Sequence, residues 1–490
     1  MNTALVLGAM LLPVLTGASL PLFRFKARRF REWYVILSVV LTSLLLLAVL
    51  LGGTAQSVTL LKLTQDFSIS FRTDGLSKVF LGLIAFLWPL ATVYAFEYIQ
   101  HEGMEDKFFS FYTYTYGITI GVASSANLIT LYLFYELLTF ATIPLIMHAM
   151  SKRAINASKK YLAYSVGGAS MAFIGIVILY ASGNRNLDFV NGGFVGLGSG
   201  DNTMLYLAYM MMFLGFGVKS AVVPLHGWLP TAGVAPTPVT ALLHAVAVVK
   251  AGVFAIMRTT YYCFGPDVLR GTWVQYVTMG LAIITILYGS AMALKEQHIK
   301  RRLAFSTVSN LSYILFGVTL MNSAGFAGAM AHMVFHGLMK ITLFLCAGAI
   351  MYQTHKEYVP ELYGFGKKMP VTFLTFSVGS LALFGIPLLP GFISKWMLAT
   401  AAMEAGSIVA YLGIGALLLS AALTAGYLLP VVVKAYAPGA DFQLESVQSV
   451  KDPNWYMKAP LVILCIAMFI LGLNSNVLTQ LLEQIAAGLL

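Results

Sequence analysis

The sequence predicts an all-α integral membrane protein with about fourteen transmembrane helices. Three observations lead to this fold class. The 490 residues are 59% hydrophobic and only 10% charged, a balance that excludes an ordinary soluble domain. Apolar stretches of about twenty residues, long enough to cross a bilayer, follow one another from end to end. The polar stretches between them are too short to form a catalytic module.

Each apolar stretch is expected to be a helix, because backbone polar groups in lipid must be paired within the segment. The expected helices span, in order, residues 4–23, 33–52, 76–98, 109–125, 127–149, 161–181, 203–223, 239–260, 272–294, 303–321, 326–352, 371–399, 407–433 and 459–484. An even number of spans places both termini on the same side of the membrane. Between the second and third helices, residues 57–73 alternate apolar and polar side chains, which predicts a short external hairpin.

Two of the expected helices are discontinuous. The seventh runs into Pro224 and further prolines, and the twelfth contains Pro387 and Pro390. Broken helices at corresponding positions of two halves are typical of inverted repeats with the transport path at the breaks. The sequence therefore predicts four segments: helices 1–3 in 1–98, a first five-helix repeat (helices 4–8) in 109–260, a second, inverted repeat (helices 9–13) in 272–436, and the C-terminal helix 14 in 459–490.

The formal charge of +11 indicates topology rather than a nucleic-acid partner, because basic residues cluster in alternate short loops. The intervening loops 182–202 and 261–271 hold few basic residues. The positive-inside rule makes the basic loops cytoplasmic and both termini external, in a cell membrane. The basic clusters are Arg24, Lys26, Arg28, Arg29 and Arg31; Lys152, Arg153, Lys159 and Lys160; Lys295, Lys300, Arg301 and Arg302; and Lys356, Lys367 and Lys368.

Five charges lie inside apolar runs or at their breaks: Glu136, Lys219, Lys250, Lys340 and Lys395. A charge near the centre of the bilayer costs about 3 kcal/mol on insertion scales. Residues of this kind typically face a hydrated interior and handle ions. The sequence therefore predicts a protein that translocates ions.

Lys219 and Glu136 are the candidates in the first half. Lys219 lies five residues before Pro224, where a proline frees a backbone carbonyl and leaves room for water. Partial burial there would let the lysine load and release a proton, and the alternative is a lysine that extends to the cytoplasmic surface. Glu136 lies well inside its span, so its partner must come from another helix, and Lys219 is that candidate. The alternative is a static salt bridge.

The eleventh helix carries the most regular pattern of titratable residues. His332, His336 and Lys340 follow one another at four-residue intervals, which places them on one face about 6 Å apart per step. Because histidine titrates near neutral pH, this row suits stepwise proton transfer through water. A metal site is the rival interpretation, although no acidic or cysteine residue lies beside the histidines.

Three further candidates extend the path. Lys250 and His244 are six residues apart, so they face different sides of their helix but can line successive points of a hydrated path. The alternative for His244 is a hydrogen-bonded core residue. Lys395 follows the second break, and we expect it to be the exit group of the second half or a lysine that extends to the surface.

No cofactor or metal is expected in this chain. Flavin, iron–sulfur and nucleotide motifs are not found, and the three cysteines (Cys263, Cys346 and Cys465) are too far apart in sequence to suggest a cluster. Any redox chemistry is therefore expected of partner subunits.

Four motifs resemble one family: VKSAVVPLHGWLPTAGVAPTPVTALLHAVAVVKAG, KRRLAFSTVSN, HMVFHGLMKITLFLCAGAI and GIPLLPGFISKW. They are similar to the antiporter-like subunits of respiratory complex I, of Mrp-type sodium/proton antiporters and of energy-converting membrane-bound hydrogenases, and the stretch ELYGFGKKMP most resembles the D subunit of Mrp antiporters. The resemblance covers helices 4 to 13. It implies the fold described above, other membrane subunits as partners, and proton or sodium translocation.

The resemblance also implies a role for each candidate residue. Glu136 and Lys219 match the glutamate–lysine pair of the first half-channel, and Lys250 matches the central connecting lysine. The remaining matches are His336 and Lys340 as central groups on helix 11, and Lys395 as the terminal lysine of the second half-channel.

The sequence departs from the family pattern at two positions. Gly233 replaces a common histidine after the WLP motif, and His298 replaces a usual acidic residue before IKRR. Three alternatives stay open: a proton-pumping subunit of a complex I type NADH-quinone oxidoreductase, a stand-alone solute transporter, and a structural membrane scaffold.

Overall fold

A computed structural model describes residues 2–23, 25, 27–53, 57–197, 202–438 and 450–489. Arg24 and Lys26 of the first basic cluster lie outside these described residues, as do the end residues Met1 and Leu490. The α-helices are α1 (Asn2–Phe23), α2 (Arg28–Leu51), α3 (Gly75–Glu102), α4 (Glu105–Ser124), α5 (Leu128–Ile146), α6 (Lys152–Ala181), α7 (Thr203–Gly217), α8 (Trp228–Thr231), α9 (Thr237–Ala245), α10 (Val248–Arg258), α11 (Pro266–Leu269), α12 (Trp273–Lys295), α13 (Ile299–Thr319), α14 (Ser323–Thr354), α15 (Pro370–Phe384), α16 (Pro390–Ala405), α17 (Ile408–Tyr436), α18 (Trp455–Leu473) and α19 (Asn476–Ala487).

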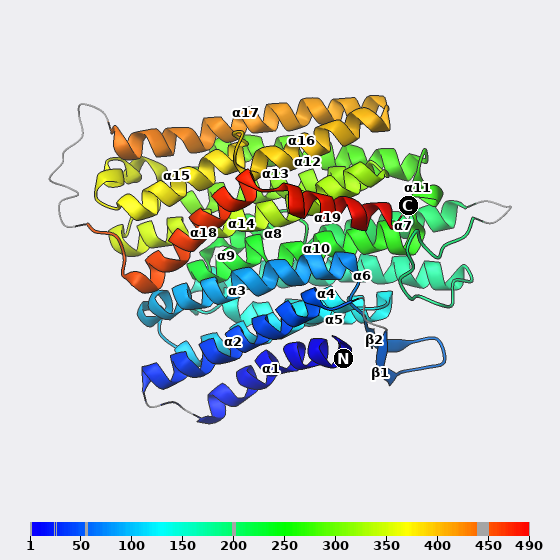
Figure 1. The fold of residues 1–490 in the computed structure, drawn as a ribbon, viewed down its shortest axis with the longest axis horizontal. Helices are drawn as coiled ribbons and strands as arrows, with labels where there is room; N and C mark the ends of the chain where they lie inside the picture. The colour runs from blue at the N-terminus through cyan, green and yellow to red at the C-terminus, as the bar shows by residue number, and fades with distance from the viewer. Residues whose placement is uncertain are drawn as a thin grey trace.

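The helices run roughly along the long axis of the molecule, with α1 and α2 at one edge and α17 at the other (Figure 1). Within the described residues, ten helical segments are long and apolar enough to cross a membrane, and α7 and α15 are shorter apolar helices. The chain is therefore an integral, multi-pass membrane protein, as predicted.

Polar side chains at helix starts explain where several helices begin. Asp74 accepts a hydrogen bond from the backbone N–H of Ser77, 3.0 Å away, at the start of α3. Asn322 does the same for Gly325 at 2.7 Å, at the start of α14. Such caps satisfy backbone donors that have no partner within the helix.

The predicted hairpin is confirmed. Strands β1 (Val58–Lys62) and β2 (Ser68–Phe71) pair antiparallel, with Thr59 opposite Ser70. The hairpin extends beyond the bundle at the end where both ends of the chain lie (Figure 1). At this end the side-chain amide of Asn191 also donates to the Gly488 carbonyl, 3.1 Å away.

The described basic loops meet at the opposite end. Arg28 forms an ion pair with Glu97 at 3.5 Å, and the hydroxyl of Tyr352 donates to the same carboxylate at 3.0 Å. His298 and Glu357 join the third and fourth basic loops with a contact of 3.2 Å. The structure thus separates a basic end of the bundle from the end that carries the hairpin.

The two predicted breaks are present, with one correction. Helix α7 ends at Gly217 rather than near residue 223, so Lys219 lies in the turn that follows the helix and not inside it. In the second break, α15 ends at Phe384 because Gly385 adopts a φ of 100°. Helix α16 starts at Pro390, a residue suited to a first helical turn.

The expected helix 239–260 is also broken, although the sequence predicts one continuous helix there. Helix α9 ends at Ala245 and α10 begins at Val248, with non-helical backbone at Val246 and Ala247. Neither residue is glycine or proline, so no local signal marks the break. The expected helix 459–484 is likewise divided, into α18 and α19.

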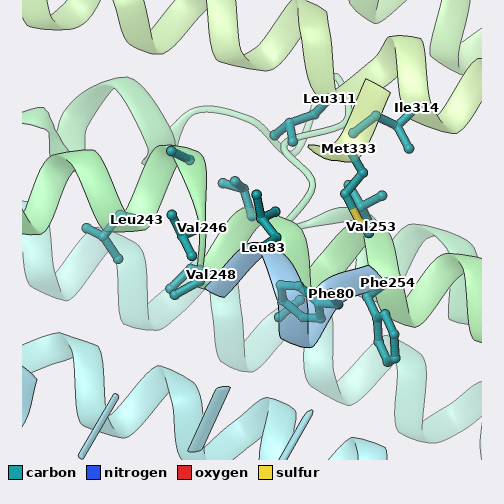
Figure 2. Close-up of a cluster of buried hydrophobic side chains, with 14 of the residues drawn as sticks. Phe80, Leu83, Leu243, Val246, Val248, Val253, Phe254, Leu311, Ile314 and Met333 are labelled. Carbon is teal, nitrogen blue, oxygen red and sulfur yellow. The ribbon is translucent and has the colours of Figure 1, made fainter. Parts of the chain in front are cut away.

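This third break lies in the core of the molecule. Every residue of α9 and α10 is buried. Figure 2 shows apolar side chains from several helices around it, among them Phe80 from α3, Leu311 from α13 and Met333 from α14. The break is therefore enclosed by protein, where non-helical backbone at membrane depth is tolerated.

Candidate functional site

Lys219 is held inside the protein at the first break. Its side chain is fully buried, and its ammonium donates a hydrogen bond to the Tyr135 carbonyl in α5. The ammonium also lies 3.5 Å from the centre of the Tyr135 ring, an arrangement that favours a cation. Burial excludes the alternative in which Lys219 extends to the surface.

Glu136 does not form the direct ion pair that the sequence predicts. Both residues are described, and the ammonium of Lys219 is bonded to the neighbouring residue, Tyr135, instead. One carboxylate oxygen of Glu136 is buried with no hydrogen-bond partner among the described residues. The two charges still interact electrostatically. The structure therefore shows the two groups as neighbours that are not in contact.

A row of side chains connects α10 to the second break. The Lys250 Nζ lies 2.7 Å from Nδ1 of His336, on α14. The ring of His336 stacks on that of His332, with 5.8 Å between ring centres, and His332 in turn stacks on Tyr313 at 5.1 Å. Each of these four residues is buried.

Lys395 stands at the far end of this row. Its ammonium lies 5.5 Å from the centre of the Tyr313 ring. It donates to the carbonyls of Leu383 and Phe384, each 2.8 Å away, in the last turn of α15. A helix end leaves such carbonyls without intrahelical partners, so the break itself supplies the acceptors for this lysine.

The structure divides the predicted row on helix 11. The two histidines stack as the four-residue spacing predicts, but Lys340 turns away from them toward α13. Its ammonium donates to the Leu303 carbonyl at 3.1 Å and to the hydroxyl of Ser306. His336 is instead bonded to Lys250, 86 residues away in the sequence.

His244 is buried beside these groups, immediately before the third break. Neither ring nitrogen has a hydrogen-bond partner among the described residues. The ring packs against Phe344 with 4.7 Å between centres and interacts electrostatically with Lys340 and Lys300. The interpretation of His244 as a hydrogen-bonded core residue is therefore not supported.

His298, one of the two departures from the family pattern, precedes the first residue of α13 at the basic end of the bundle. Burial lowers the pKa of His298, although the Glu357 carboxylate at 3.2 Å acts in the opposite direction. Beside this pair, a polar cavity of about 210 Å³ opens at the basic end, and Gly233 and Lys300 are among its lining residues.

Comparison with known proteins identifies the family. Residues 125–423 match the family described as NADH:quinone oxidoreductase/Mrp antiporter, transmembrane, and this range is more than half of the chain. The chain belongs to this family. The matched range includes the breaks after α7, α9 and α15 and every candidate residue named above.

Individual members of the NADH:quinone oxidoreductase/Mrp antiporter family resemble the chain to different extents. NADH-quinone oxidoreductase subunit N from Desulforudis audaxviator is 30% identical over 437 residues, which are 85% of this chain and 84% of that protein. A probable K⁺/H⁺ antiporter A/B subunit from Rhizobium meliloti is 35% identical over 345 residues, which are 69% of this chain but only 33% of the relative.

A solved structure shares its fold with this protein over the whole chain. A chain of the membrane-bound sulfane sulfur reductase, an archaeal respiratory membrane complex, superposes with a TM-score of 0.87, covering 100% of this chain and 98% of that chain. The two sequences are 19% identical, so this likeness concerns the fold alone.

Sequence reasoning missed several residues of this candidate site. The Tyr135 carbonyl binds Lys219, and the Tyr313 ring contacts Lys395. Ser306 is hydrogen-bonded to Lys340, and Ser394 to His332. Tyrosine and serine inside a membrane helix carry no charge and so give no distinctive signal. Their roles follow only from the neighbours that the fold brings to them.

Proposed function

We propose that the chain is an ion-translocating, antiporter-like subunit of a larger membrane complex. The observation that carries this proposal is the row from the partly buried Lys395 through the buried Tyr313, His332 and His336 to the buried Lys250. Titratable groups are costly inside a membrane, and a chain of them in contact is typical of proton and ion pathways. Family membership supports the same function.

The translocated ion is a proton, a sodium ion or both. Lysine and histidine can gain and lose a proton. A carboxylate without a direct ion pair, such as that of Glu136, can attract a proton or a sodium ion. The path we propose uses Glu136 and Lys219 in the first half. It continues with Lys250, His336 and Lys340 at the centre and Lys395 in the second half, with His244 and His332 as secondary members.

We also propose the architecture that such a path requires: fourteen transmembrane helices with two inverted repeats, 109–260 and 272–436. The breaks after α7 and α15 support this arrangement, since each has a lysine beside it, Lys219 buried and Lys395 partly buried. The basic end of the bundle would face the cytoplasm and both termini the outside.

The partners we propose are other membrane subunits, and the chain itself would hold no cofactor. The relatives include a subunit of NADH-quinone oxidoreductase and a probable K⁺/H⁺ antiporter subunit. A proton-pumping subunit of a complex I type enzyme is therefore the second candidate, beside a subunit of an Mrp-type antiporter or hydrogenase. In either case any redox centre would belong to partner subunits.

Transport by the assembled complex in membrane vesicles tests the function. We expect Lys219→Ala to lower proton or sodium translocation by about a hundredfold, the usual scale for removing a group that transfers protons. The control is Lys159→Ala, which removes an exposed lysine of α6. The amount of assembled complex is measured in parallel. Wild-type transport by an assembled Lys219→Ala complex would contradict the proposal.

A further inference from the structure

Lys340 is enclosed by a polar cluster on α13 and α17. Its ammonium donates to the Leu303 carbonyl at 3.1 Å and to the Ser306 hydroxyl, and Ser306 itself donates to the same carbonyl at 3.0 Å. Tyr427 on α17 lies near Ser306, and its hydroxyl is hydrogen-bonded to the Thr424 hydroxyl at 3.2 Å. A serine hydroxyl has one donor and two acceptor sites, so Ser306 donates to the carbonyl and accepts from the ammonium.

His244, which packs against Phe344 on the helix that carries Lys340, has ring nitrogens that are unsatisfied within the described part of the chain. His244 interacts electrostatically with the Lys340 ammonium, yet both of its buried ring nitrogens have no partner among the described residues. A neutral imidazole always presents one acceptor nitrogen. A buried acceptor without a hydrogen bond is unfavourable, so His244 is a second place where the ammonium of Lys340 can bind.

The charge on Lys250 influences whether Lys340 binds to α13 or to His244. Lys250 is bonded to His336 and interacts electrostatically with Lys340. Like charges repel strongly in a medium of low dielectric constant. A charged Lys250 therefore favours the position of Lys340 on α13, away from the central row.

We propose that Ser306 and the Leu303 carbonyl form a dock that holds Lys340 away from His244, and that ion transfer toward His244 requires Lys340 to leave this dock. The inference rests on the proposed function. When Lys340 binds the dock, the acceptor nitrogen of His244 lacks a hydrogen bond, and when Lys340 binds His244, the dock lacks its donor. Two states of comparable free energy are what a conformational switch requires. Ser306 is a positioning residue that acts through Lys340.

The pH profile of transport tests the dock, measured in vesicles with the assembled complex. The groups that interact electrostatically with Lys340 are His244 on α9, Lys250 on α10 and His336 on α14, and Tyr427 on α17 lies beside Ser306. Ser306→Ala removes an acceptor that stabilises the ammonium over the neutral amine. We expect the alkaline limb of the profile to move to lower pH by about one unit.

Three further variants distinguish the effect of the hydroxyl from the effect of packing. Ser306→Thr keeps the hydroxyl and should restore the wild-type profile. Ser312→Ala, on the same helix, removes a buried hydroxyl that has no partner among the described residues, and should leave the profile unchanged. If Ser306→Ala does not assemble, Ser306→Cys keeps the volume with a weaker acceptor and should give a smaller shift in the same direction.

The outcomes distinguish the dock from the function on which it rests. An unchanged profile in Ser306→Ala, an equal shift in Ser312→Ala, or no recovery in Ser306→Thr would overturn the dock. Lys340→Ala is measured beside them. If that variant loses transport while Ser306→Ala behaves as wild type, only the dock is wrong. If Lys340→Ala transports normally, the proposed path through Lys340 is wrong.

Discussion

At the scale of single residues, buried charges in this protein differ in how fully they are paired. Arg258 is completely buried at the end of α10, and both of its terminal nitrogens donate to the Asp74 carboxylate, one of them at 2.8 Å. Aromatic rings, including that of Tyr262, surround its guanidinium. The lysines of the proposed path are bonded mainly to carbonyls and hydroxyls instead. We infer that Arg258 is a structural charge and the lysines are the exchangeable ones.

Asp74 allows a stability prediction with a defined sign. Burial raises the pKa of the Asp74 carboxyl, but the Arg258 guanidinium and the backbone N–H of Ser77 outweigh it and hold the pKa below its ordinary value. The carboxylate therefore stabilises the fold above about pH 4, and this contribution is lost as the pH falls through the lowered pKa. Asp74→Asn leaves Arg258 buried without its counter-charge and should cost about 3 kcal/mol.

The thermal stability of the purified complex as a function of pH measures this effect. The matched control is Asp267→Asn, because the side chain of Asp267 is 95% exposed. An Asp74→Asn complex as stable as wild type at neutral pH would show that the ion pair contributes nothing.

At the scale of secondary structure, helix breaks position the site, and close packing fixes where the broken ends lie. Gly252 in α10 faces the turn that carries Lys219. A Cβ at this glycine would lie 2.7 Å from the backbone nitrogen of Ser220 and 2.9 Å from the Lys219 Cβ. The absence of a side chain thus lets α10 approach the first break.

We expect Gly252→Ala to lower ion transport although it changes no charge. The added methyl group must displace the turn, and misplacement of a reacting group by about 1 Å can cost about a hundredfold in rate. The control is Gly280→Ala in α12, where an added Cβ meets nothing within 4 Å. Transport assays on both complexes measure the difference. Equal transport by the two variants would mean that the turn is free to move.

At the scale of the whole molecule, charge is distributed between the two ends of the bundle. The described basic loops lie at one end, and the β1–β2 hairpin lies at the other with both ends of the chain (Figure 1). Positive loops remain on the cytoplasmic side during membrane insertion, so the two ends should face different compartments.

Labelling with a membrane-impermeant thiol reagent checks this topology. Lys62→Cys in β1 and Lys159→Cys in α6 both place the thiol at an exposed position. We expect Lys62→Cys to react in intact cells and Lys159→Cys to react only after permeabilisation. The wild-type chain is the control, since Cys263 and Cys346 are buried and Cys465 is partly so. The reverse pattern would invert the proposed orientation.

The amino-acid sequence by itself determined the properties that depend on neighbouring residues. The length of the apolar stretches determined the membrane helices, and the alternation of apolar and polar residues determined the hairpin. Proline and glycine residues determined the breaks after α7 and α15. The four-residue spacing of His332 and His336 determined their stacking. Each of these is a local effect of chain geometry, and the repeat architecture and the roles of the candidate residues stay predictions.

Only the tertiary structure decided which groups meet. It bonded Lys219 to Tyr135 instead of Glu136, and it joined Lys250 to His336 and Lys340 to Ser306. It also interrupted the expected helix at Val246 and Ala247, where no proline or glycine predicts a break. These contacts join residues up to 86 positions apart, and their partners are neutral or backbone groups. A hydrogen bond of this kind depends on where helices pack, which no local pattern records.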